Sequence, residues 1–169
     1  MILNIRGNLI EFNRPAVMGI VNVTPDSFFA GSRVPADSVT ARVSEMMAQG
    51  ADIIDLGGYS SRPGADTVTA EEELARLVPA IAAIRERFPD IPVSVDTFRA
   101  DVARECIAQG ADIINDIGGG DLDPEMFGTI ADLRVPYILM HMRGTPATMQ
   151  SLTDYDDVVA DVLRDLAFK

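Results

Sequence analysis

The sequence is poor in the residue types that most metal and covalent-intermediate sites require. Among its 169 residues there is a single cysteine, a single histidine and a single lysine, and there is no tryptophan. Lone Cys106 excludes an internal disulfide and a site with several thiolates. Lone His141 excludes a zinc site built from several histidines. The lysine is Lys169, the last residue, so no lysine elsewhere offers an amine for a Schiff base.

Long apolar runs and basic charge are also scarce. No run reaches the roughly 18 apolar residues that a membrane span needs. The amino terminus lacks the basic and then apolar layout of a signal peptide, so we expect a cytoplasmic protein. Fourteen Lys and Arg residues against 26 Asp and Glu residues give a formal net charge of −12. That balance argues against binding to nucleic acid and to anionic lipid.

The remaining composition suits one globular domain, residues 1–169, with a hydrophobic fraction of 47%. Residues 2–5 and 9–12 flank Gly7-Asn8, a pattern that predicts a short amino-terminal β-hairpin. Five later apolar runs are typical of strands buried on both faces; they cover 17–21, 53–56, 91–95, 113–114 and 137–140.

Helical patterns lie between these runs. Thr69 and Glu72 form a capping box that opens a helix with an apolar face, and we expect Pro79 to kink that helix. Asp123-Pro124 predicts the first residues of a later helix. A last helix is expected around 158–166, so the chain contains five strand–helix units.

One short motif occurs twice. The seven residues 49–55, Gln-Gly-Ala-Asp-Ile-Ile-Asp, recur at 109–115 with Asn as the last residue. Both copies join a helix to a strand through a short link, whereas the links that follow the first two strands are long. Long loops at the carboxyl ends of parallel strands carry the sites of α/β proteins. Two architectures fit this pattern: an open doubly wound sheet, and part of a (β/α)₈ barrel, which typically needs about 250 residues.

Polar residues stand at or just after the strand ends, where they face the mouth of a sheet. An alternative is that some of them cap helices or bind loop amides. Ser60-Ser61-Arg62-Pro63-Gly64 combines hydroxyls with a guanidinium and suits an anion, although a surface turn has the same composition. The strand-end residues are Asn22, Asp55, Asp96, Asn115, Asp116 and His141.

Five motifs in order resemble one family, the dihydropteroate synthases of folate biosynthesis. The resemblance covers the amino-terminal three-fifths of that family, and five motifs in the same order leave little room for coincidence. The matching segments are Met18-Gly19-Ile20-Val21-Asn22-Val23-Thr24-Pro25-Asp26-Ser27-Phe28, Gly57-Gly58-Tyr59-Ser60-Ser61-Arg62-Pro63-Gly64, Ser94-Val95-Asp96-Thr97, Ile114-Asn115-Asp116-Ile117 and Leu139-Met140-His141-Met142-Arg143-Gly144.

The resemblance implies a fold, a reaction and a set of partners. The fold is α/β, a (β/α)₈ TIM barrel of which about five βα units are present. The reaction joins 6-hydroxymethyl-7,8-dihydropterin diphosphate to p-aminobenzoate and releases diphosphate with Mg²⁺. The small-molecule substrates are the expected partners, the complete protein is expected to be a homodimer, and sulfonamides compete for the p-aminobenzoate site.

The resemblance also implies roles for individual residues. Asn22 is the metal ligand and contacts the diphosphate, together with Ser61 and Arg62. Asp96 and Asn115 bind the pterin edge, and Ile117 and Met140 pack on its ring. Asp26 and Arg62 are the catalytic candidates, and the p-aminobenzoate pocket takes Ser27, Phe28 and Pro63.

The sequence departs from the family pattern at two positions of the second motif. Tyr59 stands where Glu is common, and Ser61 stands where Thr is common. The later family blocks, with a pterin-binding Asp, a Ser-Arg-Lys and an Arg-x-His, lie outside these 169 residues, so we expect this segment alone to be inactive. Two other interpretations stay open: a non-catalytic pterin-binding remnant, and a pterin-binding methyltransferase domain.

Overall fold

The chain begins with a hairpin that closes the amino-terminal end of a parallel sheet. The computed structural model describes residues 2–23, 36–59 and 68–169. Strands β1 (Ile2–Ile5) and β2 (Asn8–Glu11) pair antiparallel, as predicted, with Arg6-Gly7 as the turn. Ile5 is buried against Ile53 and Ile113, so the hairpin covers the first residues of two sheet strands.

Five parallel strands follow one another in space in the order in which they occur in the sequence. They are β3 (Met18–Asn22), β4 (Ile53–Gly57), β5 (Val93–Asp96), β6 (Ile113–Asp116) and β7 (Tyr137–Leu139). A doubly wound sheet reverses its strand order at a switch point, and these five strands do not. The consecutive order is that of a (β/α)₈ barrel, so the predicted architecture is confirmed.

The stagger between strands is also that of a barrel. Asp55 pairs with Ser94, and Ser94 pairs with Ile113. In the repeated motif Ile113 corresponds to Ile53, but in the sheet Ile113 is level with Asp55. The repeated motif is therefore displaced by two residues between β4 and β6, which are two strands apart. One residue per strand gives a shear of eight over eight strands, which is the value for this barrel type.

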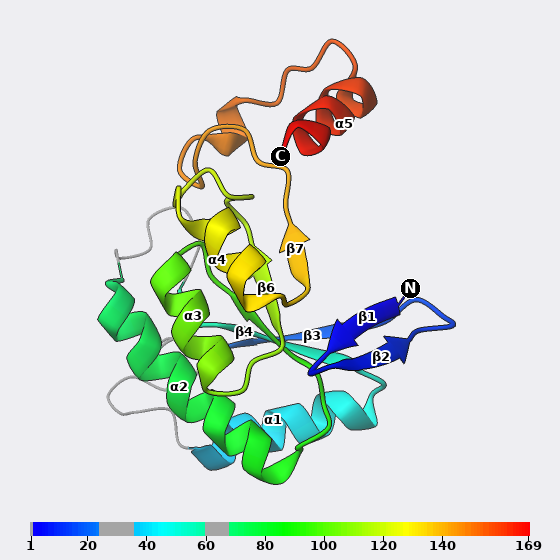
Figure 1. Cartoon of the computed structure of the whole chain (residues 1–169), viewed down its shortest axis with the longest axis vertical. Helices are drawn as coiled ribbons and strands as arrows, with labels where there is room; N and C mark the ends of the chain where they lie inside the picture. Colours follow the sequence, from blue (N-terminus) through cyan, green and yellow to red (C-terminus); the bar gives the residue numbers. More distant parts are fainter. Residues whose placement is uncertain (1, 24–35, 60–67) are drawn as a thin grey trace.

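Helices cover one face of the sheet (Figure 1), because right-handed crossovers between consecutive parallel strands place every helix on the same side. Alternate residues of the strands, such as Ile54, Leu56 and Val95, are buried beneath them. No helix within the described ranges combines the length and apolarity of a membrane span. The four covering helices are α1 (Ala36–Ala48), α2 (Ala70–Arg87), α3 (Ala100–Ala108) and α4 (Met126–Leu133).

The capping box at the start of α2 is confirmed. Thr69 Oγ1 accepts from the Glu72 amide at 3.2 Å, and Glu72 Oε2 accepts from the Thr69 amide at 3.0 Å. The capping box therefore fixes where α2 begins. From there the helix continues through Pro79 to Arg87 as one element.

The predicted start of α4 at Asp123-Pro124 is wrong, because the helix begins at Met126 with Glu125 as its N-cap. Asp123 Oδ1 accepts from the Glu125 amide at 3.0 Å, and its Oδ2 accepts from the Ala100 amide at 2.7 Å. Asp123 therefore binds the amide of Ala100, the first residue of α3, which lies 23 residues earlier in the sequence.

The final helix, α5 (Val158–Phe168), forms where the periodicity predicts it but stands apart from the helical layer (Figure 1), beyond the short 3₁₀ turn η2 (Met149–Ser151). Asp157 caps it through the amides of Val159 and Ala160. No side chain of α5 is buried within the described residues, and Leu163 is 63% exposed.

The repeated motif builds the same joint twice. Gly50 and Gly110 follow their helices with positive φ angles of 101° and 107°. In both copies the aspartate accepts from a backbone amide at the start of the neighbouring strand: Asp52 from Val17, the residue before β3, at 2.9 Å, and Asp112 from Val93, the first residue of β5, at 2.8 Å. The repeat is thus a device that joins neighbouring strands at their amino-terminal ends.

The two aspartates differ in burial. Asp52 binds Arg14 through both carboxylate oxygens, at 2.7 and 2.9 Å, and its side chain is 19% exposed. The Asp112 side chain is 0% exposed and pairs with Arg85 and with Arg6, whose Nε lies 2.9 Å from Oδ1. The second joint therefore holds a buried carboxylate that pairs with two arginines.

We predict that Asp112→Asn destabilises the intact protein far more than Asp52→Asn. Loss of one partner from a buried pair costs about 3–5 kcal/mol, whereas an exposed pair contributes about 1 kcal/mol or less. Urea unfolding of the two matched variants measures the difference. Equal losses would show that burial does not govern the contribution of this repeated residue.

The sheet leaves two edges and part of one face uncovered within the described residues. Strands β3 and β7 each have one neighbour. Ile20 and Ile138 point away from the helices and are 60% and 37% exposed. Apolar edge strands pair readily with other chains.

We predict that residues 1–169, expressed alone, associate through these edges. Sizing chromatography should show oligomers or aggregate, and Ile138→Lys should shift the population toward the 18.2 kDa monomer. Leu9→Lys is the matched control, because Leu9 is 75% exposed on the hairpin, outside the five-stranded sheet. A monodisperse monomer of the unmodified segment would contradict the prediction.

Candidate active site

Polar side chains form one row at the carboxyl ends of the strands. The register places Asn22 opposite Gly57, Gly57 opposite Asp96, and Asp96 opposite Asn115. Paired residues of parallel strands point to the same face. Asn22, Asp96 and Asn115 therefore all face away from the helices, into the mouth of the barrel.

Gly57 makes room for the polar atoms of this row. A Cβ atom at Gly57 would lie 3.0 Å from Asn22 Oδ1 and 3.9 Å from Asp96 Oδ2. Both oxygens therefore lean over the same backbone position, one from each neighbouring strand. Asn22 is exposed and Asp96 is half-buried, so a ligand at the mouth reaches both.

Beneath the row, Asp55 holds Asn115 in place. Asn115 Nδ2 donates to Asp55 Oδ2 at 3.1 Å. The amide nitrogen thus faces the barrel interior, which leaves Asn115 Oδ1 as the acceptor on the other side. Burial raises the pKa of Asp55, and hydrogen bonding to Ser94 and Asn115 lowers it in part.

Among the carboxyl groups of the site, Asp96 has the most strongly shifted pKa. Burial, followed by repulsion from Asp55, Glu73 and Asp116, raises the pKa of Asp96 to about 7. Near neutral pH this carboxyl is therefore divided between an acceptor-only carboxylate and an acid that also donates. A carboxyl with such a shift, among other polar side chains, is a typical feature of a functional residue.

The next residue along β6 has a structural task. Asp116 Oδ1 accepts from the Gly118 amide at 2.7 Å, and its Oδ2 accepts from the Gly120 amide at 2.8 Å and from the Tyr137 hydroxyl at 2.6 Å. Asp116 therefore orders the glycine loop that follows the strand. For this strand-end residue the capping alternative is correct.

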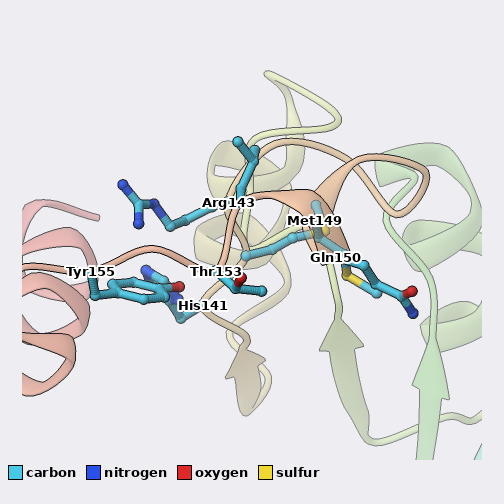
Figure 2. A pocket seen from close by; sticks show the side chains of 8 residues that line it. His141, Arg143, Met149, Gln150, Thr153 and Tyr155 are labelled. Carbon is cyan, nitrogen blue, oxygen red and sulfur yellow. The ribbon is translucent and has the colours of Figure 1, made fainter.

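His141 lies beyond β7 and is bound by the last helix. Its Nε2 is 2.9 Å from Asp165 Oδ2. A hollow of about 270 Å³ opens beside it (Figure 2), where the Arg143 guanidinium stacks over Tyr155 at 4.4 Å. Asp96 and Asn115 do not line this hollow, so it is separate from the polar row.

The remaining predicted site residues fall into two groups. Ile117 and Met140 follow β6 and β7 at the same end of the sheet, and both are half-buried. The others lie outside the described residues, and their roles stay predictions: Asp26, Ser27, Phe28, Ser61, Arg62 and Pro63.

The row also bears on the predicted metal. Within the described ranges, no three His, Cys, Asp or Glu side chains are grouped closely enough to hold a metal ion. Mg²⁺ usually binds through one or two protein oxygens and completes its shell with water and substrate phosphates. Asn22 is exposed, and its Oδ1, with Asp96 Oδ2 near the same glycine, fits that incomplete kind of site.

Sequence reasoning missed a buried ion pair behind the row. Glu73 of α2 is fully buried and pairs with Arg99, which directly follows Thr97-Phe98 beyond β5. The signal was present in the helix pattern, because Glu73 shares the apolar face of Leu77 and Ile84. A charged residue in such a stripe indicates a buried partner.

Comparison with known proteins agrees with the geometry. Residues 18–169 match the model of a family described as pterin binding enzyme. The chain belongs to this family. It is 49% identical over 150 residues to a dihydropteroate synthase of Synechocystis, and the match covers 88% of the chain and 52% of that protein.

Solved structures give the same result. A Yersinia pestis dihydropteroate synthase in complex with a sulfonamide drug has a TM-score of 0.88 and 42% identity, over 99% of the chain and 61% of that protein. A Xanthomonas albilineans dihydropteroate synthase with 4-aminobenzoic acid has a TM-score of 0.84 and 42% identity, over 98% and 58%. The chain thus spans little more than half the length of these relatives.

We predict that Asp96→Asn stabilises the intact protein at alkaline pH. The pKa of Asp96 is raised from 3.8 to about 7, so the folded state keeps a proton that the unfolded state releases. The resulting cost is absent well below pH 3.8, grows as the pH rises from 3.8 toward 7 and is complete above it. Removing the charge should add on the order of 1–2 kcal/mol at pH 8, after allowance for solvent screening.

Thermal unfolding between pH 4 and pH 8 tests this prediction. The two curves of midpoint against pH should lie closest together at pH 4 and separate as the pH rises. Asp90→Asn is the control, because Asp90 is exposed in the turn after α2. A constant offset between Asp96→Asn and the unmodified protein at all pH values would contradict the prediction.

Proposed function

We propose that the intact protein containing this chain is a dihydropteroate synthase, which condenses 6-hydroxymethyl-7,8-dihydropterin diphosphate with p-aminobenzoate. The observation that carries the proposal is the row of Asn22, Asp96 and Asn115 over Gly57. A pterin is a flat ring with a donor and acceptor edge. An aspartate and an oriented asparagine bind such an edge much as they bind the edge of a base.

The residues of the row divide the recognition between them. Asp55 fixes the amide of Asn115, so Asn115 Oδ1 accepts from a ring N–H or amino group. Asp96, with a pKa of about 7, supplies either a second acceptor or a donor. Ile117 and Met140 offer apolar contact to the ring faces. This set binds the pterin but provides no positive charge for a diphosphate.

The diphosphate end of the substrate is bound by Asn22 and by the predicted residues Ser61 and Arg62. Asn22 Oδ1, with the substrate oxygens, would hold Mg²⁺, which when bound neutralises the charge that grows on the departing diphosphate. Arg62 contributes the same stabilisation through charged hydrogen bonds. The C–O bond to the diphosphate breaks first. The amine nitrogen of p-aminobenzoate then forms its bond to the methylene carbon and loses a proton.

Two assays test the proposal. The intact protein, incubated with both substrates and Mg²⁺, should form 7,8-dihydropteroate and diphosphate in equal amounts, and residues 1–169 alone should not. A chimera in which residues 1–169 replace the equivalent segment of the Yersinia pestis synthase should also be active. A folded chimera that binds pterin without turnover would favour the non-catalytic remnant and overturn the proposal.

Two substitutions in the intact protein should separate pterin binding from diphosphate binding. Asp96→Ala should abolish binding of a pterin that lacks the diphosphate, measured by calorimetry. Arg62→Ala should leave that binding intact and raise the KM for the pterin diphosphate about 10- to 100-fold, the effect of losing a charged hydrogen-bond partner. If both variants impair both measurements equally, the division of roles is wrong.

A further inference from the structure

A hydrogen bond between Asp55 and Asn115 fixes the direction of an amide in the polar row. Asn115 Nδ2 donates to Asp55 Oδ2 at 3.1 Å. A carboxylate offers acceptors and no donor. If the amide turned over, Asn115 Oδ1 would face Asp55 and two acceptors would repel each other. Asp55 therefore determines which end of the Asn115 amide faces the mouth of the barrel.

Burial makes this preference strong. Asp55 is 3% exposed, and its Oδ1 is buried without a hydrogen bond to any described residue. A turned Asn115 would therefore leave the buried carboxylate without its amide donor. A buried acceptor that loses its donor costs far more than one that water can reach. The orientation of Asn115 is thus built into the interior of the barrel.

The fixed amide presents two different atoms side by side. Oδ1 accepts, and Nδ2 keeps a second hydrogen for donation, because Asp55 takes only one. Asn115 is half-buried opposite Asp96 at the mouth, and its Oδ1 binds none of the described residues. An amide in this arrangement matches a ring edge that carries an amino group next to an acceptor nitrogen, which is how asparagine binds adenine.

We propose that Asp55 is a positioning residue that makes the site specific for a ring with an amino group at C2. This inference rests on the proposed function. A pterin carries that amino group beside the acceptor N1, and the fixed amide of Asn115 matches both. In lumazine a carbonyl replaces the amino group and N1 carries a hydrogen, so donor and acceptor change places. Asn115 would match lumazine only after turning over, and Asp55 opposes that turn.

Asp55→Asn in the intact protein tests the proposal. Asparagine has nearly the same shape but offers an acceptor and donors, so Asn115 can then adopt either orientation. The readout is the ratio of the affinities for 6-hydroxymethylpterin and 6-hydroxymethyllumazine, measured by calorimetry, because the loss of a charge near Asp96 affects both ligands. Ser94→Ala is the matched control: Ser94 pairs with Asp55 in register, is 0% exposed, and its hydroxyl does not bind the Asn115 amide.

The expected result is a loss of discrimination. The unmodified protein should bind the pterin about tenfold more tightly than the lumazine, or better, as a matched pair of hydrogen bonds at a ring edge provides. Asp55→Asn should bring the ratio close to one, and Ser94→Ala should preserve it. An unchanged ratio in Asp55→Asn would overturn the proposal. Equal loss of the ratio in both variants would show a merely structural effect and would overturn it too.

A second variant serves if Asp55→Asn does not fold. The exchange Asp55→Asn with Asn115→Asp keeps the buried hydrogen bond but reverses its direction. The mouth then presents a carboxylate, which accepts from the amino group of the pterin or from N1 of the lumazine but matches neither edge completely. Its ratio should also be close to one. A ratio that stays at the value of the unmodified protein would overturn the proposal.

A measurement without substrate separates this proposal from the proposed function. In the intact protein, one of the two side-chain amide protons of Asn115 should exchange slowly with water, because Asp55 holds it; NMR of isotope-labelled protein measures this rate. Asp55→Asn should accelerate the exchange, and Ser94→Ala should not. Slow exchange and the expected ratios in a protein that forms no dihydropteroate would support the positioning role and reject the synthase activity. Fast exchange in the unmodified protein would overturn the positioning role whatever the activity.

Discussion

The row of polar side chains depends on the register between neighbouring parallel strands. The pairing places Asn22, Asp96 and Asn115 in one row, with Gly57 between Asn22 and Asp96. A slip of one residue at any strand would turn its polar side chain toward the helices and an apolar one toward the mouth. Asp52 and Asp112 support this register at the amino-terminal ends of the strands, where they accept from the amides of Val17 and Val93.

The same register forces acidic groups together. Asp96 lies close enough to Asp55, Glu73 and Asp116 for each of them to raise its pKa. All three of these neighbours have partners: Glu73 pairs with Arg99, Asp55 accepts from Asn115, and Asp116 accepts from two amides and a hydroxyl. Asp96 has no such partner among the described residues, and its unfavourable ionisation is a stability cost that a ligand with a donor edge would remove.

Local signals in the sequence were sufficient for the elements but not for contacts between distant residues. The hairpin, the five strands and the capping box at Thr69 follow from patterns a few residues long, and the structure has them. Asp123 failed as a helix start because its second oxygen caps Ala100 in another helix, a contact that no local pattern contains. Arg99 and Glu73 are 26 residues apart in the sequence, and only the fold joins them. The barrel itself was decided by family motifs, since periodicity allowed an open sheet.

The repeat shows how one difference in sequence adapts a structural motif to the candidate site. The two copies are identical in their first six residues, which include the aspartate that joins the strands. They differ at the last residue, which is Asp55 in one copy and Asn115 in the other. In the fold these two side chains meet, with Asn115 Nδ2 lying 3.1 Å from Asp55 Oδ2. Two aspartates at that separation repel and share a proton, whereas aspartate and asparagine form a donor–acceptor pair of fixed direction. Divergence at this one position therefore replaces a repulsion with the hydrogen bond that orients Asn115 toward the mouth of the barrel.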